Sequence, residues 1–185
     1  MITNKDRSGW FGASDTSTIV GNYKTKTFKK WWLVKLGLSE NDYSNKAMEV
    51  GNIFEHKILD TILGVRKDHQ ILISELRLRV NFDGDKDNVI YEVKTTKNEA
   101  KISKAYWRQA QVEMYAMKTD KLFIVFYELT ERDYKNYFSE IETGRIKFLS
   151  VEYDFNFIEN EYLPKLKYLN KCLNDGVMPD SEYVY

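Results

Sequence analysis

The chain has 185 residues, 43% of them hydrophobic and 15% aromatic, and its formal net charge is zero. This composition excludes a disordered chain and a uniformly basic nucleic-acid coat protein, although it leaves room for local basic surfaces. A single cysteine, Cys172, excludes an internal disulfide framework and a cysteine-based zinc or iron–sulfur site.

We expect one domain over residues 1–185, because the chain contains no internal repeat, low-complexity tract or Pro/Gly-rich linker. The N-terminal segment, MITNKDRSGW, lacks the apolar stretch of a signal peptide. No apolar run approaches the length that a membrane span requires. The sequence therefore predicts a soluble, cytoplasmic protein.

Helices are predicted in the first third of the chain. A turn leads into a short helix over 12–21, for which Ser14 is a plausible N-cap. A second helix is predicted over 27–37. Apolar residues at helical spacing predict a third helix over 45–64, which Gly64 would end.

Strands follow these helices. Apolar residues alternate well enough within 71–82 to predict strand structure, and the segment 89–96 is predicted to be a further strand. Between them we expect a hairpin-like turn that carries Asp83, Gly84 and Asp85. The two flanking strands would then pair with each other.

Helices and strands alternate in the remainder of the chain. A helix is predicted over 101–119, and the nearly continuous apolar run of 121–129 is typical of a central strand covered on both faces. A helix over 132–144, an edge strand over 145–154 and a last helix over 156–175 complete the order. This order predicts an α/β fold with a central mixed β-sheet flanked by helices.

A carboxylate and a lysine share one face of the 89–96 strand. Side chains alternate across a strand, so Glu92 and Lys94 project together, and Asp83 can lie beside Glu92 if the strands pair. Two close carboxylates repel each other unless a cation lies between them, and hard oxygen ligands suit Mg²⁺ or Mn²⁺. The Val93 carbonyl could add a ligand, and Lys94 could orient or deprotonate a water and help to neutralise a phosphate. This pattern indicates metal-assisted phosphodiester hydrolysis.

Each of these residues also has a purely structural interpretation. Charged residues make up 30% of the chain, so Glu92 and Lys94 could form an ion pair on a surface hairpin. Glu55 could face the sheet from its helix or be exposed to solvent. Gln111 and Tyr115, four residues apart, could meet on one face of their helix or belong to a mixed polar and aromatic side.

Taken together and in order, these segments resemble the PD-(D/E)XK nuclease superfamily. The matching segments are Gly51-x₃-Glu55, Asp83, Glu92-Val93-Lys94 and Gln111-x₃-Tyr115. More narrowly, the chain resembles the YqaJ-type viral recombinase family, which includes phage lambda exonuclease. The resemblance implies a restriction-endonuclease-like core, in which Asp83, Glu92, Glu55 and the Val93 carbonyl bind metal. It also implies that Lys94 is catalytic and that Gln111 and Tyr115 belong to the active site.

The N-terminal segment RSGWFGAS resembles the part of this family that binds the 5′-phosphate of a DNA end. Arg7 and Ser14 match the family's Arg-x₆-Ser, and Gln109 matches a glutamine associated with the same phosphate. A guanidinium can bind a phosphate through two hydrogen bonds. Asn81 stands where the family has a phosphate-contacting serine, and its amide can donate a hydrogen bond. Alternatively, Ser14 only caps a helix and Arg7 is an unrelated surface residue.

The resemblance implies a Mg²⁺-dependent deoxyribonuclease, with Mn²⁺ as a substitute. It would be a 5′→3′ exonuclease that digests double-stranded DNA from 5′-phosphorylated ends in phage-type recombination. A homotrimeric ring and a single-strand annealing protein as partner are also implied. The alternatives are a PD-(D/E)XK endonuclease or RecB-like nuclease with a different end requirement, and a catalytically inactive DNA-binding module of the same fold. Asp85 is an extra acid that could compete with Asp83 as a metal ligand.

Basic and aromatic residues near the N-terminus have two interpretations. The segment 24–35 carries five lysines and no acid, and it could line a DNA path or form a solvated face. Trp10, Phe11, Trp31 and Trp32 could stack on frayed bases. Packing in the core is expected for at least two of these four aromatic residues.

Overall fold

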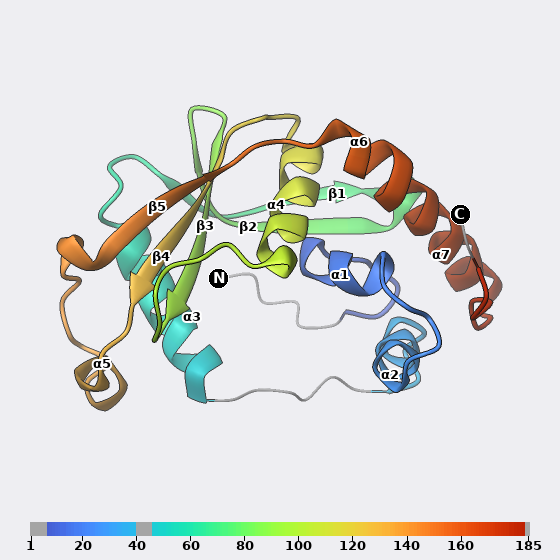
Figure 1. Cartoon of the computed structure of the whole chain (residues 1–185), viewed down its shortest axis with the longest axis horizontal. Helices are drawn as coiled ribbons and strands as arrows, with labels where there is room; N and C mark the ends of the chain where they lie inside the picture. Colours follow the sequence, from blue (N-terminus) through green and yellow to red (C-terminus); the bar gives the residue numbers. More distant parts are fainter. Residues whose placement is uncertain (1–6, 40–45, 184–185) are drawn as a thin grey trace.

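The structure is a computed structural model that describes residues 7–39 and 46–183 (Figure 1). Its described part contains a five-stranded sheet in the order β1-β2-β3-β4-β5. The strands are β1 (Arg66–Ile73), β2 (Leu78–Lys86), β3 (Val89–Thr96), β4 (Leu122–Glu128) and β5 (Ile146–Val151). Only β3 and β4 pair in parallel, and the other neighbours are antiparallel. The predicted mixed sheet is therefore confirmed.

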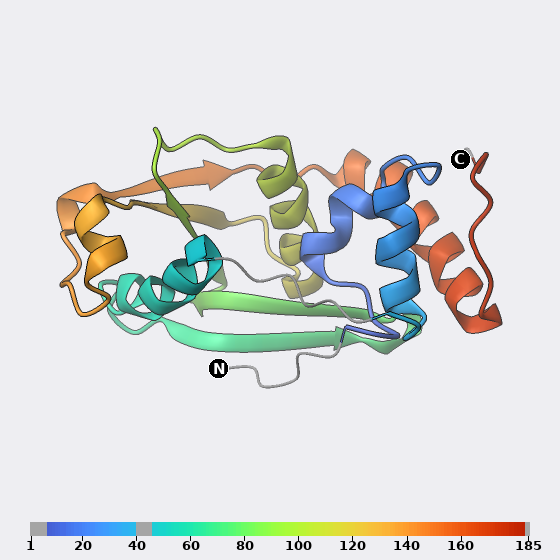
Figure 2. The same cartoon turned by 90° about the horizontal axis from the view of Figure 1, so that it is seen from below.

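Helices cover both faces of this sheet. They are α1 (Thr16–Ile19), α2 (Lys26–Lys35), α3 (Lys46–Leu59), α4 (Lys104–Met117), α5 (Glu131–Lys135), α6 (Phe155–Phe157) and α7 (Leu163–Asp175). A 3₁₀ turn over Ala13–Asp15 leads into α1, and a π-helical turn over Ile158–Tyr162 joins α6 to α7. Figure 2 shows α4 close to α1, whereas α3 lies toward the α5 end of the molecule.

Two hydrophobic clusters of the described residues hold α4 and α3 against the central strands. Val112 of α4 belongs to the larger cluster together with Ile124. Phe54 of α3 belongs to the smaller cluster together with Val125. Consecutive residues of a strand point to opposite faces, so α4 and α3 cover opposite sides of β4. The strand is apolar from Leu122 to Tyr127 because both of its faces are covered there, as the sequence predicted, and Glu128 at its end is exposed.

The β2–β3 hairpin turns later than predicted. Asp87 and Asn88 form the turn, with φ angles of 50° and 61°, which is the backbone of a tight two-residue hairpin loop. Asp83, Gly84 and Asp85 were expected in the turn and instead belong to β2. Their prediction as a turn was wrong because Asp-Gly is a strong turn signal that pairing overrode here.

Other predicted boundaries also need correction. The helix predicted over 132–144 is limited to α5, since the Asn136 side chain accepts the Phe138 N–H at 3.0 Å and turns the chain there. Ser14 is not the N-cap of its helix. The Asp15 carboxylate accepts the Gly12 N–H at 2.8 Å instead. Strand β1 begins at Arg66, before the predicted segment. Its first residues escaped the prediction because they are polar, as is common in an edge strand.

None of the helices in 7–39 and 46–183 combines the length and the apolar character that crossing a membrane requires.

Gly84 packs closely against α3, and this contact can be tested. A Cβ atom at Gly84 would lie 2.8 Å from Leu59 Cδ2, and Leu59 is fully buried. We therefore expect Gly84→Ala to lower the free energy of unfolding by about 1–3 kcal/mol, because the core would have to shift. Urea unfolding measures the change. Gly144→Ala is the matched control, since its Cβ would meet nothing within 4 Å, and an equal effect of both substitutions would contradict the prediction.

Candidate active site

A cavity of about 190 Å³ lies between the N-terminal segment, β2, β3 and α4. Six of the predicted site residues line it, namely Arg7, Ser14, Asn81, Asp83, Glu92 and Gln109. Its remaining lining residues are Trp10, Phe11, Gly12, Ala13, Asp15, Lys35, Arg79 and Glu113. Carboxylates of the sheet and α4 thus share one cavity with the basic and hydroxyl groups of the N-terminal part.

Pairing of β2 with β3 brings Asp83 next to Glu92. Gly84 of β2 is the partner of Tyr91 of β3, and the pairing continues from there to the turn. Asp83 lies one residue before this paired segment. There the Asp83 carboxylate accepts the backbone N–H of Val93 at 2.8 Å, so the side chain continues the contact between the strands. The predicted proximity of Asp83 and Glu92 follows from this register.

Lys94 and Gln109 bind the Glu92 carboxylate. Glu92 is only 4% exposed, and its Oε1 lies 2.6 Å from the Lys94 ammonium. Gln109 Nε2 donates to the same oxygen at 2.5 Å and to Oε1 of Glu113 at 2.7 Å. The Lys94 ammonium also lies 5.2 Å from the centre of the Tyr106 ring. The site is therefore a connected network that β3 and α4 build together.

The pKa values of Asp83 and Glu113, two acids beside Glu92, are raised. Burial raises the pKa of Asp83 well above its usual value, and Glu92 and Glu55 raise it further. Burial and the Glu92 charge also raise the pKa of Glu113 well above its usual value. Burial alone would lower the pKa of Lys94, but Glu92 and Asp83 outweigh it and the pKa is raised. Burial is the main cause of the raised carboxyl pKa values, and repulsion between neighbouring carboxylates adds to it.

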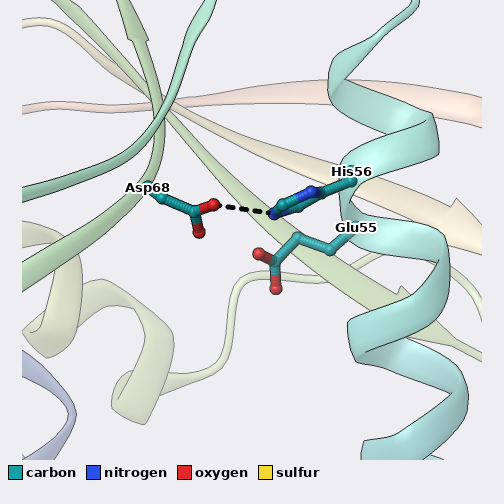
Figure 3. A group of neighbouring side chains, drawn as sticks. All are labelled: Glu55, His56 and Asp68. Carbon is teal, nitrogen blue, oxygen red and sulfur yellow. Dashed lines mark ion pairs between the residues drawn. The ribbon is translucent and has the colours of Figure 1, made fainter. Parts of the chain in front are cut away.

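Glu55 approaches the site from α3. It is half-buried, and burial followed by the Glu92 charge raises its pKa. Ligand atoms of Glu55, His56 and Asp68 also lie within 4.8 Å of one another, close enough to share a cation (Figure 3). His56 Nε2 is 3.2 Å from Asp68 Oδ2 in this group. Glu55 thus lies within electrostatic reach of both the cavity acids and His56.

The donor set fits a hard divalent cation. Glu92 Oε2 and Glu113 Oε2 are buried and have no hydrogen-bond partner among the described residues. A buried carboxylate oxygen without a partner is costly, and a hard cation would satisfy it. Asp83, Glu92 and Glu55 are the predicted side-chain ligands that stand close enough to influence one another electrostatically. Val93, whose carbonyl was predicted as a ligand, is buried, and its backbone N–H donates to Asp83.

Basic residues also line this cavity. Arg7 and Ser14 are exposed to solvent, and Lys35 and Arg79 join them on the cavity wall. Lys35 is 2% exposed, and its ammonium lies 2.6 Å from Asp15 Oδ2. Burial lowers the pKa of Lys35, although Asp15 opposes this shift. These groups give an anion both charge and hydrogen-bond donors.

The Lys35 ammonium also shapes the N-terminal segment. It donates to the Trp10 carbonyl at 2.8 Å, while the Trp31 indole N–H donates to Asp15 Oδ1 at 2.9 Å. Phe11 and Trp32 are fully buried, which confirms that at least two of the four aromatic residues belong to the core. Trp10 lines the cavity instead.

Asn81 and Asp85 lie on β2 on either side of Asp83. Asn81 lines the cavity, and its side-chain oxygen accepts a hydrogen bond from Gln70 Nε2 at 2.7 Å. Asp85 pairs instead with Arg66 at 2.8 Å and with His69 at 3.2 Å. The structure therefore does not support Asp85 as a competitor of Asp83.

Gln111 and Tyr115 do not reach this cavity, which corrects their expected placement. The Gln111 amide donates to the Glu152 carbonyl at 2.8 Å and accepts the Asp154 N–H at 2.6 Å. Tyr115 lines a larger and more apolar cavity of about 840 Å³. Residues two positions apart on a helix point about 200° away from each other, so Gln109 and Gln111 cannot both face the site.

Three residues of the cavity, Glu113, Lys35 and Arg79, were not predicted as site residues from the sequence. Glu113 follows Gln109 by four residues, and this spacing places both on one helix face. Arg79 precedes Asn81 and Asp83 at intervals of two on β2, so strand alternation could have found it. No sequence signal singles out Lys35 among the lysines of its helix, because its burial depends on tertiary packing.

The raised pKa values predict how stability depends on pH when no metal is present. A carboxyl group with a raised pKa in the folded state binds protons more tightly there than in the unfolded chain. Stability therefore falls as pH rises from the usual carboxyl range through the raised folded value. We expect Asp83→Asn to reduce this fall.

Urea unfolding of the EDTA-treated protein at pH 5 and pH 8 measures the difference. Asp120→Asn, a substitution at an exposed site, is the control and should leave the pH dependence as it is in the unsubstituted protein. Equal pH dependence in Asp83→Asn and in the unsubstituted protein would contradict the assignment of Asp83 to the repulsive cluster.

Several solved structures with a similar fold are exonucleases. An alkaline exonuclease (LHK-Exo) from Laribacter hongkongensis is 18% identical, with a TM-score of 0.70 over 91% of this chain and 90% of that chain. Its complex with dAMP gives 17% identity and a TM-score of 0.70 over 90% and 89% of the two chains. A phage-related exonuclease from Haemophilus somnus gives 15% identity and a TM-score of 0.62 over 90% and 92%.

Comparisons of sequence alone give no match, either to a family model or to a curated protein. The likeness to the exonucleases is therefore one of fold, and it extends over most of each chain. This chain has the α/β nuclease fold of those exonucleases, as the restriction-endonuclease-like core predicted from its sequence implies.

Proposed function

We propose that this protein is a metal-dependent deoxyribonuclease that digests double-stranded DNA from 5′-phosphorylated ends in the 5′→3′ direction. One observation carries the proposal: a single small cavity is lined by Arg7 and Ser14 together with Asp83 and Glu92. A terminal phosphate bound by Arg7 and Ser14 would hold the first linkage of the strand near the carboxylates. Such an arrangement favours stepwise release of nucleotides from an end.

A divalent cation is part of the proposal, and Mg²⁺ with Mn²⁺ as a substitute suits these ligands. Asp83, Glu92, Glu55 and the Val93 carbonyl would hold it. When bound, such an ion makes water a better nucleophile and offsets charge on the reacting phosphate. The partnerless buried Oε2 of Glu92 supports this assignment.

Lys94 would act on the phosphate and on the attacking water. Its raised pKa keeps it protonated in the metal-free protein, so we assign it hydrogen-bond donation rather than removal of a proton. Its ammonium is held on Glu92 and near the Tyr106 ring, which directs it to the same side of β3 as the carboxylate. This position suits a charge that stabilises negative oxygen as the bond breaks.

The basic and hydroxyl groups that line the cavity would bind the terminal phosphate. Arg7 offers a bidentate guanidinium and Ser14 a hydroxyl, while Lys35 and Arg79 add positive charge to the wall. Asn81 and Gln109 could contribute amide donors between these groups and the acids. The exonuclease from Laribacter hongkongensis in complex with dAMP offers a parallel, because dAMP is a deoxynucleoside monophosphate of the kind that stepwise digestion would release.

A role in phage-type recombination, within the cytoplasm of a bacterial host, is part of the same proposal. A nuclease of this kind would expose single strands for a single-strand annealing protein. A homotrimeric ring around DNA would explain processive digestion through its closed geometry. The similar fold of a phage-related exonuclease supports this context.

Hydrolysis should depend on Glu92 and Lys94. We expect Glu92→Gln and Lys94→Ala each to reduce the rate by about 10³-fold or more, because each removes charge that acts directly on the reacting phosphate. Release of labelled nucleotide from linear duplex, with Mg²⁺ and with EDTA, measures the loss. Glu128→Gln and Lys147→Ala, at exposed positions, are the matched controls. Unchanged rates in the two site variants would refute the proposed function.

Closed circular plasmid separates the exonuclease from the endonuclease alternative. The proposed enzyme leaves the circle intact and degrades it after linearisation. Cutting of the closed circle by the unsubstituted protein, with loss of cutting in Glu92→Gln, would favour the endonuclease. An inactive DNA-binding module would show no hydrolysis under either condition.

Arg7 should determine the preference for a 5′-phosphate. We expect Arg7→Ala to lower the ratio of rates on 5′-phosphorylated and 5′-hydroxyl duplex by about 10- to 100-fold, since charge-assisted hydrogen bonds contribute about 1.5–3 kcal/mol. The rate on 5′-hydroxyl ends should change little. Arg132→Ala, at an exposed position on α5, is the control, and an equal loss on both kinds of end would show that Arg7 does not recognise the phosphate.

A further inference from the structure

Glu113 is a buried acid of the cavity that the nuclease motif does not include. It projects from α4, its side chain is 0% exposed, and it lines the cavity together with Asp83 and Glu92. Its Oε1 accepts a hydrogen bond from Gln109 at 2.7 Å. Its Oε2 is buried and has no hydrogen-bond partner among the described residues. A fully buried glutamate with one unsatisfied oxygen needs a partner that these residues do not supply.

Glu113 and Glu92 lie close to each other because one nitrogen binds both. Gln109 Nε2 is 2.5 Å from Glu92 Oε1 and 2.7 Å from Glu113 Oε1. The two oxygens are therefore no farther apart than these two hydrogen bonds laid end to end. Each carboxylate also keeps its Oε2 without a partner. Two acids so placed can bind one cation with only a small movement.

A second cation would give Glu113 a charged partner. Asp83, Glu92 and Glu113 line one small cavity, and Lys94 contacts the Glu92 carboxylate. A single divalent ion on Asp83 and Glu92 would leave Glu113 Oε2 without a partner among the described residues. Buried carboxylates in contact repel each other unless cations lie between them.

We propose that Glu113 is a metal ligand which, together with Glu92, holds a second divalent cation in this cavity. The inference rests on the metal-dependent centre of the proposed function and adds a ligand that the motif lacks. It also gives Gln109 a second role. An amide nitrogen has two hydrogens, and here both donate to carboxylates. A cation that takes over one carboxylate would release a Gln109 N–H for the terminal phosphate.

Binding of Mn²⁺ in the absence of DNA tests this assignment. Titration of the full-length protein, followed by electron paramagnetic resonance of free Mn²⁺ and by calorimetry, gives the stoichiometry and the affinities. We expect two Mn²⁺ per chain for the unsubstituted protein. In Glu113→Gln the second ion should be lost or bound at least about tenfold more weakly. Glu128→Gln, an exposed substitution, should bind as the unsubstituted protein does.

Equal stoichiometry and equal affinities in Glu113→Gln and the unsubstituted protein would overturn the proposal. A single Mn²⁺ in the unsubstituted protein would do the same, because Glu113 would then serve only to hold Gln109. Glu113→Gln removes buried negative charge without changing the side chain's size, so it should fold. Glu113→Asp is a second variant that keeps the charge and withdraws the oxygens, and it should also weaken the second ion.

The experiment also separates this inference from the proposed function, since it measures metal alone. Two bound Mn²⁺ that depend on Glu113, without any digestion of DNA, would uphold the ligand assignment and refute the nuclease. Digestion of DNA with Mn²⁺ binding that is the same in Glu113→Gln would uphold the nuclease and refute the role of Glu113.

Discussion

Repulsion between buried carboxylates is the constraint around which this molecule is organised. β2, β3 and α4 bring Asp83, Glu92 and Glu113 into one cavity, and Lys94 forms an ion pair with Glu92. Such an arrangement weakens the metal-free protein, so the energy to maintain it must come from elsewhere. The two hydrophobic clusters on the faces of the sheet are the evident source.

The connection from β3 through α4 to β4 explains how the acids and their partners meet. A parallel strand pair needs a crossover, and α4 supplies it by returning over the face from which Glu92 and Lys94 project. Gln109 then binds the Glu92 carboxylate, and Glu113 binds the same nitrogen of Gln109. The buried pair of Lys35 and Asp15 holds the N-terminal segment beside the cavity, so Arg7 and Lys35 are placed by a different part of the chain, whereas Arg79 comes from β2.

Alternation and motif spacing were enough to predict the strand at 89–96 and the proximity of Asp83 to Glu92. Both depend on local rules that the tertiary structure did not override. Local rules could not predict how α4 is rotated about its axis, because this rotation depends on which residues the sheet and α1 bury. That rotation selects Gln109 and Glu113 and turns Gln111 away. The hairpin turn at Asp87 was missed for a related reason, since strand pairing outweighed the Asp-Gly signal.

The volume of the small cavity limits what a strand end can present to the protein. Pockets that enclose drug-sized molecules usually measure about 300–1,000 Å³, and this one measures about 190 Å³. It is smaller than those pockets, so it would not enclose a whole nucleotide. A strand end would then be held in it mainly by its phosphate, a group that all four nucleotides share.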